Sequence, residues 1–151
     1  MKQLIKPFRT VALIGAVHLC SSVHAPGSEA RLDKLGSPVI FRGDSRNAYR
    51  DPMLMCGDGC FRLFFTKVEI EPDDRVFSYT AWSKSRDLVT WTQPVKFTPR
   101  DQNLNYGSPG NIVRDGDEWV LCLQTYPRPN GERFGNETSR IWTMRSKDLE
   151  T

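Results

Sequence analysis

The chain has 151 residues, with 21 Lys and Arg against 18 Asp and Glu and a hydrophobic fraction of 38%, which is the composition of a soluble globular protein. The one stretch that resembles a membrane span lies at the N-terminus, where an apolar run from Val11 to about Val23 follows three basic residues. This run is too short to cross a bilayer. Val23-His24-Ala25 has small residues at the −3 and −1 positions that a signal peptidase recognises. Residues 1–25 are therefore predicted to be a signal peptide. The mature protein is expected to be secreted or periplasmic, with no membrane partner.

Removing residues 1–25 takes away three basic residues, no acidic residue and both histidines. The mature chain then has 18 residues of each charge, and a surface without net positive charge argues against nucleic acid or an anionic membrane as the main partner. Without histidine, the mature chain has no Ser-His-Asp or Cys-His catalytic system and no imidazole metal site. Its acid–base chemistry is expected to rest on carboxylates, and the residues indicate no cofactor and no metal site.

After a polar lead over residues 26–40, short apolar or alternating runs are separated by Gly, Asp, Asn and Pro, and no stretch keeps a helical period for three turns. This pattern predicts an all-β fold. Asp58-Gly59 and Asp115-Gly116 are expected to turn two hairpins, because Asp-Gly pairs favour the tight turns that join antiparallel strands. The predicted strands are Met53–Cys56, Phe61–Thr66, Phe77–Ser85, Val95–Thr98, Asn111–Arg114, Trp119–Thr125 and Ile141–Ser146.

The two halves of the mature chain repeat each other. Pro52–Gly59 has the same spacing of Pro and Gly as Pro109–Gly116, which lies 57 residues later. Ser85–Thr90 matches Ser146–Thr151 at an offset of 61 residues. Short antiparallel strands that recur in fours at a fixed spacing of about 40–50 residues or more are typical of propeller blades.

The repeat predicts a first propeller blade over residues 41–98 and a second over residues 99–151. The Ser-x-Asp-Leu turn of the first blade leads to Trp91, whereas the sequence ends at Thr151, one residue before the second Trp is due. A propeller closes with roughly four to eight blades. The chain is therefore interpreted as the N-terminal portion of a larger propeller, with an incomplete second blade.

These segments resemble a known family. Tyr49–Thr66 and Ala81–Trp91 resemble the first blade of glycoside hydrolase family 43, and Ser108–Leu121 resembles the second blade of that family. The resemblance implies a five-bladed β-propeller that hydrolyses glycosidic bonds, usually with inversion, in arabinose- or xylose-containing polysaccharides. The Arg-Asp-Pro triplet at residues 50–52 also resembles one in the fructoside-cleaving propellers of family 32, which leaves the substrate class open.

The resemblance to family 43 implies that Asp51, before proline on the first inner strand, is the general base; the alternative is a turn aspartate with no chemical role. An inverting glycosidase also needs a carboxylic acid about 6.5–9.5 Å away. In the family that acid is a Glu of the third blade, which would lie beyond Thr151. The second-blade Asp of the family falls on Gly110, and the neighbouring Asn111 cannot ionise. The chain is therefore expected to contain an incomplete active site.

Five residues are expected to contact a carbohydrate substrate. Arg50 has a planar guanidinium that suits a sugar hydroxyl or a carboxylate, and a strand-edge ion pair is the alternative. Asn105 and Tyr106 precede the second inner strand, near the expected mouth of the propeller funnel, and Asn111 lies on that strand. Tyr126 begins a long loop that either lines a sugar subsite or projects into solvent.

Two other functions are compatible with the sequence. The glycine at position 110, where family 43 has an Asp, favours a non-catalytic carbohydrate-binding propeller. The absence of the last strand of the second blade is compatible with a non-functional truncated product. Glu118, Glu132 and Glu137 of the second unit are expected to be solvated charges rather than acid catalysts. The resemblance also allows a calcium ion in the funnel of a full-length protein, with ligands from further blades. The sequence predicts no oligomeric state.

The mature chain retains an odd number of cysteines: Cys56, Cys60 and Cys122. Cys56 and Cys60 flank Gly57-Asp58-Gly59 and could form a disulfide across a tight hairpin in an oxidising compartment. The alternative is that all three are small buried apolar side chains.

Overall fold

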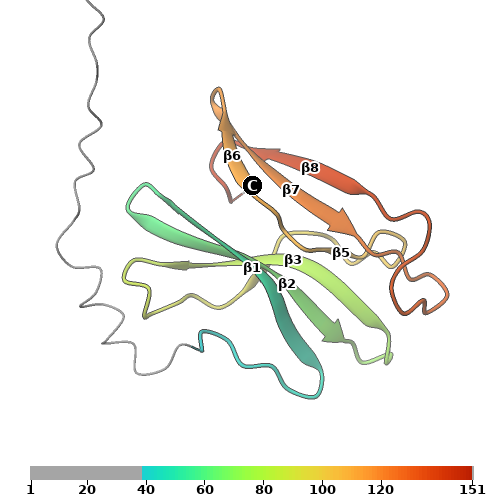
Figure 1. The fold of residues 1–151 in the computed structure, drawn as a ribbon. Coiled ribbons are helices and arrows are strands. Elements are labelled where there is room, and N and C mark those ends of the chain that lie inside the picture. Colours follow the sequence, from blue (N-terminus) through green and yellow to red (C-terminus); the bar gives the residue numbers. More distant parts are fainter. Residues whose placement is uncertain (1–38, 151) are drawn as a thin grey trace, which may run out of the picture. The chain divides into compact units, whose positions relative to one another are not determined.

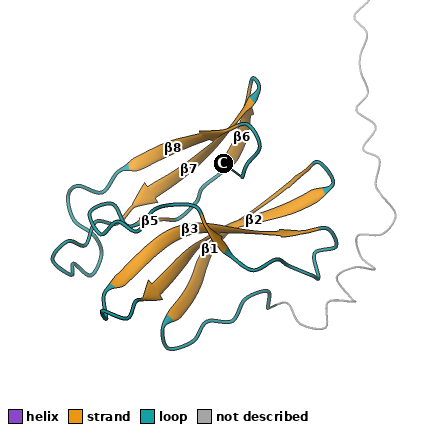
Figure 2. Ribbon diagram, turned by 180° about the vertical axis from the view of Figure 1, so that it is seen from behind, coloured by secondary structure: helices purple, strands orange, loops and turns teal. Residues whose placement is uncertain are grey.

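The computed structural model describes residues 39–150, and the fold there is all-β, as predicted. Figures 1 and 2 show two antiparallel sheets, and no helix occurs among the described residues. The predicted signal peptide and most of the lead segment lie outside the described residues. No helix of the described part is long and apolar enough to cross a membrane. The strands are β1 (Asn47–Gly57), β2 (Cys60–Ile70), β3 (Val76–Ser85), β4 (Val95–Lys96), β5 (Tyr106–Gly107), β6 (Ile112–Asp115), β7 (Glu118–Thr125) and β8 (Ile141–Ser146).

The first sheet contains β1, β2, β3 and β4 in chain order, each antiparallel to its neighbour. The β1–β2 hairpin closes on Asp58 and Gly59, whose φ angles of 54° and 67° lie in the left-handed region that such two-residue turns require. β2 and β3 pair without interruption from Phe61 to Ile70. The predicted hairpin at Asp58-Gly59 is thereby confirmed, and the strands on either side of it are longer than predicted.

The second sheet is built around β7, which pairs with β5, β6 and β8. Because β8 pairs along β7 from Trp119 to Gln124, β5 and β6 share the other edge of β7 and form an interrupted inner strand. The β6–β7 ladder ends with Asp115 opposite Glu118, so the turn residues are Gly116 and Asp117. The turn therefore lies one position later than predicted, and Gly116 supplies its positive φ of 62°.

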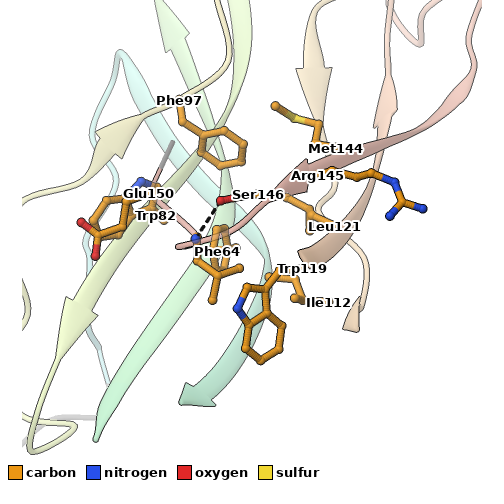
Figure 3. Close-up of a pocket in the computed structure, with 11 residues that line it drawn as sticks. Phe64, Trp82, Phe97, Ile112, Trp119, Leu121, Met144, Arg145, Ser146 and Glu150 are labelled. Carbon is orange, nitrogen blue, oxygen red and sulfur yellow. Dashed lines mark hydrogen bonds between the residues drawn. The ribbon is translucent and has the colours of Figure 1, made fainter. Parts of the chain in front are cut away.

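A cluster of buried apolar side chains joins the two sheets. Phe64 and Trp82 come from the first sheet, Leu121 and Leu123 come from β7, and Leu149 comes from the turn after β8. Full burial of such side chains contributes about 1.5–3 kcal/mol each. The cluster leaves an apolar cavity of about 170 Å³ between the sheets, which Figure 3 shows with its aromatic lining. The inter-sheet core therefore packs β2 and β3 of the first sheet against β7 of the second.

A second cluster covers the opposite face of the first sheet. Leu63, Phe65 and Ala81 are buried there beneath the rings of Phe41 and Tyr49, whose centroids lie 5.4 Å apart. Both faces of β2 are therefore buried. This explains why the middle of β2 is a continuous apolar run and not an alternating one.

The sequence repeat is also present in the hydrogen bonds of the two Ser-x-Asp-Leu turns. Ser85 Oγ accepts the Leu88 N–H at 2.8 Å, and Ser146 Oγ accepts the Leu149 N–H at 2.8 Å. Both leucines have a φ of 63°. The Asp87 carboxylate accepts two backbone N–H groups of the first turn. The two turns are therefore the same structure at an offset of 61 residues, from Leu88 to Leu149.

The three described cysteines are free. In the β1–β2 ladder Cys56 lies opposite Phe61 and Cys60 lies opposite Gly57, so the two thiols do not face each other across the hairpin. Cys56 and Cys122 are exposed, and Cys60 is half-buried. The suggested Cys56–Cys60 disulfide and the alternative of three buried thiols are therefore both wrong.

Candidate functional site

Asp51 lies at an irregularity in β1. The β1–β2 register shifts between Arg50 and Met53, so Asp51 and Pro52 form a bulge that has no partners in the ladder. Proline has no N–H to donate, and a bulge accommodates it within a strand. Asp51 has a φ of 55°, in the left-handed region that few residues other than glycine adopt. The bulge leaves the Asp51 side chain 37% exposed.

Two hydroxyl groups bind the same oxygen of Asp51. Thr66 Oγ1 donates to Asp51 Oδ2 at 2.8 Å, and Ser108 Oγ donates to it at 3.0 Å. The Ser108 N–H donates in turn to Thr66 Oγ1 at 2.6 Å. Thr66 belongs to β2 of the first sheet, and Ser108 directly follows β5 of the second. The carboxylate therefore lies where β2 of the first sheet approaches the end of β5 of the second.

The hydrogen bonds continue from Ser108 to the end of β7. Ser108 Oγ lies 3.5 Å from the Tyr126 hydroxyl, and the side-chain amide of Gln124 donates to the same hydroxyl. We call Asp51, Thr66, Ser108, Gln124 and Tyr126 the Asp51 cluster. The structure thus brings together Asp51 and Tyr126, two residues that were predicted separately.

The close approach of β5 to β2 depends on Gly107. A Cβ atom at this position would lie 3.2 Å from Thr66 Cγ2 and 3.4 Å from Thr66 Oγ1. These distances are tight for a Cβ atom, so glycine leaves the space that the Thr66 side chain occupies. The contact between the Ser108 backbone and Thr66 follows from this packing.

Arg50 lies beside Asp51 on β1. Arg50 Nε is 3.8 Å from Asp51 Oδ2, and the two side chains are 49% and 37% exposed. Solvent screens an ion pair of this length and exposure, so it adds little stability. The Arg50 guanidinium is accessible, and the geometry is compatible with both predicted roles, the sugar contact and the strand-edge ion pair.

Asn105 is a buried residue that connects two segments of backbone. Its side chain is fully buried, Oδ1 accepts the Ser78 N–H at 2.5 Å, and Nδ2 donates to the Tyr126 carbonyl at 2.9 Å. Both ends of the amide are therefore bound to backbone of β3 and of the segment after β7. The predicted sugar contact at Asn105 is wrong, because no surface of this side chain is available to a ligand.

Tyr106 packs against the inter-sheet core. Burial, and to a smaller extent the charge of Asp101, raises the pKa of its hydroxyl group. Tyr106 makes none of the hydrogen bonds of the Asp51 cluster, although it is two residues before Ser108. Its predicted sugar contact stays a prediction without support from these contacts.

Gly110, which the resemblance aligns with the second-blade Asp of family 43, makes a backbone hydrogen bond to β7. The Gly110 N–H donates to the Cys122 carbonyl at 2.7 Å, and the Asn111 carbonyl accepts the Cys122 N–H at 3.2 Å. A Cβ atom at Gly110 would approach Cys122 to 3.5 Å, which is ordinary contact. The backbone therefore has room for a side chain at Gly110. Asn111 is exposed and is not hydrogen-bonded to the Asp51 cluster.

Among residues 39–150, no second acidic side chain makes a hydrogen bond or ion pair with the Asp51 cluster. Glu118 pairs with Arg145 at 3.2 Å, and Glu132 accepts the Asn130 N–H at 3.0 Å. Glu137 is exposed. The described part also contains no group of three or more His, Cys, Asp or Glu residues that could ligate a metal ion. Asp51 is therefore the one carboxylate of this cluster.

Three members of the Asp51 cluster were not predicted from the sequence. Ser108 stands 57 residues after Asp51 and, like it, precedes a proline. The repeat could therefore have indicated that Ser108 occupies the position equivalent to Asp51. Thr66 and Gln124 are polar residues within strands, and no motif distinguishes them from other strand residues. Their roles depend on the pairing of β2 with β1 and on the position of β7 beside β5.

Comparisons with known proteins find similarity only in structure. No protein-family model matches the sequence, and no curated protein matches it significantly. A protein from Parabacteroides distasonis ATCC 8503, assigned to the glycoside hydrolases, has a similar structure, with a TM-score of 0.53 and 16% identity over 70% of this chain and 31% of that one. A glycosyl hydrolase from Bacteroides ovatus matches with a TM-score of 0.52 and 15% identity over 70% of this chain and 30% of that one. The chain thus spans less than a third of the length of these structures, and at this identity they establish the fold alone.

Proposed function

We propose that this chain is part of a β-propeller glycoside hydrolase similar to family 43, in which Asp51 is the general base. Two four-stranded antiparallel sheets with repeated turns support the blade interpretation, with blades over residues 41–98 and 99–151. The fold similarity to two glycoside hydrolases supports the same class of protein. The proposed substrate is an arabinose- or xylose-containing glycan, cleaved with inversion, and the proposed location is secreted or periplasmic.

The observation that carries this proposal is the environment of Asp51. Its carboxylate is partly exposed, lies in a strained bulge, and is bound through Oδ2 by hydroxyl groups of both sheets. Left-handed backbone at a residue other than glycine is a feature that clusters at functional sites. A turn aspartate without a chemical role would need no partner from a second sheet. The geometry therefore favours the catalytic role over the structural one.

In the proposed reaction, Asp51 accepts a proton from a water molecule while the water oxygen bonds to the anomeric carbon from the face opposite the leaving group. The bond between the anomeric carbon and the glycosidic oxygen breaks, and that oxygen takes a proton from a carboxylic acid. None of residues 39–150 occupies the acid's place in the Asp51 cluster. The acid is proposed to be a Glu of a further blade, as the resemblance implies.

A non-catalytic carbohydrate-binding propeller is the second candidate function. The specific observation in its favour is Gly110, which has space for a side chain but supplies no carboxylate. Such a protein would bind a sugar beside Asp51, Arg50 and Tyr126 without cleaving it.

The two functions are separated by turnover of p-nitrophenyl α-L-arabinofuranoside and p-nitrophenyl β-D-xyloside. Because p-nitrophenolate leaves without protonation, these substrates test Asp51 without requiring the general acid. Loss of a general base costs about 10²–10⁴-fold in rate, so Asp51→Asn should reduce kcat by that factor. Asp58→Asn is the matched control, since it removes an exposed carboxylate from a hairpin where Asn-Gly is equally favourable.

The outcome decides between the candidates. A parent protein that binds arabinose or xylose in calorimetry and shows no turnover would support the carbohydrate-binding function. Equal rates for the parent and Asp51→Asn would eliminate Asp51 as the base.

A further inference from the structure

The hydrogen bonds at Asp51 Oδ2 have a fixed direction. A threonine hydroxyl has one proton and accepts through its lone pairs. Because the Ser108 N–H already donates to Thr66 Oγ1 at 2.6 Å, the Thr66 oxygen is an acceptor in that bond. Its own proton is then free for Asp51 Oδ2, 2.8 Å away. The backbone of the second sheet therefore orients the Thr66 hydroxyl toward the carboxylate.

All polar contacts of Asp51 within the described part of the chain involve the same oxygen. Thr66 and Ser108 donate to Oδ2, and the Arg50 guanidinium is nearest to Oδ2. Oδ1 has no hydrogen-bond partner among residues 39–150. Two donors on one oxygen and none on the other leave Oδ1 as the oxygen that can accept a proton from a water molecule.

Thr66 is also well placed to keep this geometry rigid. It is 0% exposed, and it pairs with Arg50 on one side and with Thr80 on the other in the ladders of the first sheet. Gly107 packs directly against it. A buried side chain in the centre of a sheet has little freedom to rotate, so the Asp51 carboxylate is fixed by a donor that is itself fixed.

We propose that Thr66 is a positioning residue, which together with Ser108 fixes Asp51 Oδ2 so that Oδ1 is the oxygen that deprotonates the attacking water. This inference rests on the proposed function. Misplacement of a catalytic group by about 1 Å can cost on the order of 10²-fold in rate. A positioning role therefore predicts a loss in kcat with little change in KM, because Thr66 is buried and does not contact the sugar.

The test compares three variants of the full chain on p-nitrophenyl α-L-arabinofuranoside and p-nitrophenyl β-D-xyloside. Thr66→Val removes the hydroxyl and should lower kcat by about 10–100-fold at unchanged KM. Thr66→Ser keeps the hydroxyl and should restore kcat to within a few-fold of the parent. Thr80→Val is the matched control, because Thr80 is equally buried on the neighbouring strand and its hydroxyl has no partner in the described part of the chain.

Circular dichroism and thermal melting of each variant separate a folding defect from a positioning defect. If Thr66→Val is folded and retains the parent kcat while Asp51→Asn is inactive, the positioning inference is overturned and the proposed function stands. If Thr66→Ser is as slow as Thr66→Val, the hydroxyl is not the relevant group and the inference also fails. If Asp51→Asn retains the parent kcat, or if the parent turns over neither substrate, the proposed function fails and the inference fails with it.

Discussion

Asp51 and Ser108 lie 57 residues apart in the sequence and are joined by a hydrogen bond of 3.0 Å. Each precedes the proline of its copy of the repeat, Pro52 or Pro109, and their φ angles of 55° and 45° are both positive. Equivalent positions of two repeats meet when their inner strands converge on one centre. In the first copy this position carries a carboxylate, and in the second it carries a hydroxyl that donates to the carboxylate.

Gly107→Ala should destabilise the protein and disturb the Asp51 cluster. The new Cβ would lie 3.2 Å from Thr66 Cγ2, and both residues are buried, so the Thr66 side chain must give way by a few tenths of an ångström in a tightly packed contact. Overpacking of this kind costs about 1–3 kcal/mol. Urea denaturation measures the loss. Gly110→Ala is the control, because its Cβ would make ordinary contacts of 3.5 Å, and equal losses for both variants would contradict the prediction.

Asn105→Ala should reduce stability by more than the exposed control Asn103→Ala. The substitution leaves the Ser78 N–H and the Tyr126 carbonyl without their partner, and an unsatisfied buried group costs about 1–3 kcal/mol. The φ of 51° at Asn105 adds strain for alanine, which adopts this region less readily than asparagine. Thermal melting measures the difference. A destabilisation no greater than that of Asn103→Ala would show that Asn105 does not connect these strands.

The strand pattern and the repeat could be read from the sequence because both depend on local signals. Alternating apolar runs and Asp-Gly turns predicted the hairpins, and the two Ser-x-Asp-Leu motifs predicted matching turns. β5 was missed because a strand of two residues, Tyr106 and Gly107, has no periodicity to detect. The position of β5 depends on tertiary contacts, because it pairs with β7 and packs against Thr66 of β2.

The candidate site was predicted less well than the fold. Asp51 was named by the resemblance alone, and its role as general base stays a prediction, while the structure shows its hydrogen bonds to Thr66 and Ser108. Asn105 was predicted to contact a sugar because it precedes the second inner strand near the expected funnel mouth. Its amide is instead buried and binds backbone groups of β3 and of the segment after β7, partners that only the tertiary structure brings together. The contact of Thr66 with Asp51 could not be predicted from the sequence, because it depends on the shift in the β1–β2 register at Asp51 and Pro52.

The three described cysteines should differ in reactivity toward maleimide. Cys56 and Cys122 are exposed and free, whereas Cys60 is half-buried and its thiol lies 3.6 Å from the Ser85 carbonyl oxygen. Cys56 and Cys122 should therefore be labelled first in the native protein, with Cys60 following on unfolding. Mass spectrometry of the labelled peptides gives the order. A Cys56–Cys60 peptide pair that resists labelling until a reductant is added would contradict this prediction.

Asp87 should make the stability of the protein depend on pH in the acid range. Its carboxylate accepts backbone N–H groups of Thr90 and Val89, and these bonds lower its pKa from 3.8 to about 2. Because the folded pKa lies below the unfolded one, the folded state binds fewer protons in between. The stabilisation is therefore complete above about pH 5 and is lost as the pH falls from 3.8 toward 2.

Asp87→Asn tests this directly, because the amide oxygen can still accept the turn N–H groups but does not titrate. Melting temperatures of the parent and the variant should be measured from pH 6 to pH 2. The parent should lose more stability than the variant below pH 4, since the variant lacks one carboxylate whose protonation opposes folding. The Ser146–Leu149 turn is unchanged in both proteins, so the difference between the two curves reports on the first turn alone. Parallel curves over the whole range would show that the Asp87 carboxylate does not stabilise the turn through its charge.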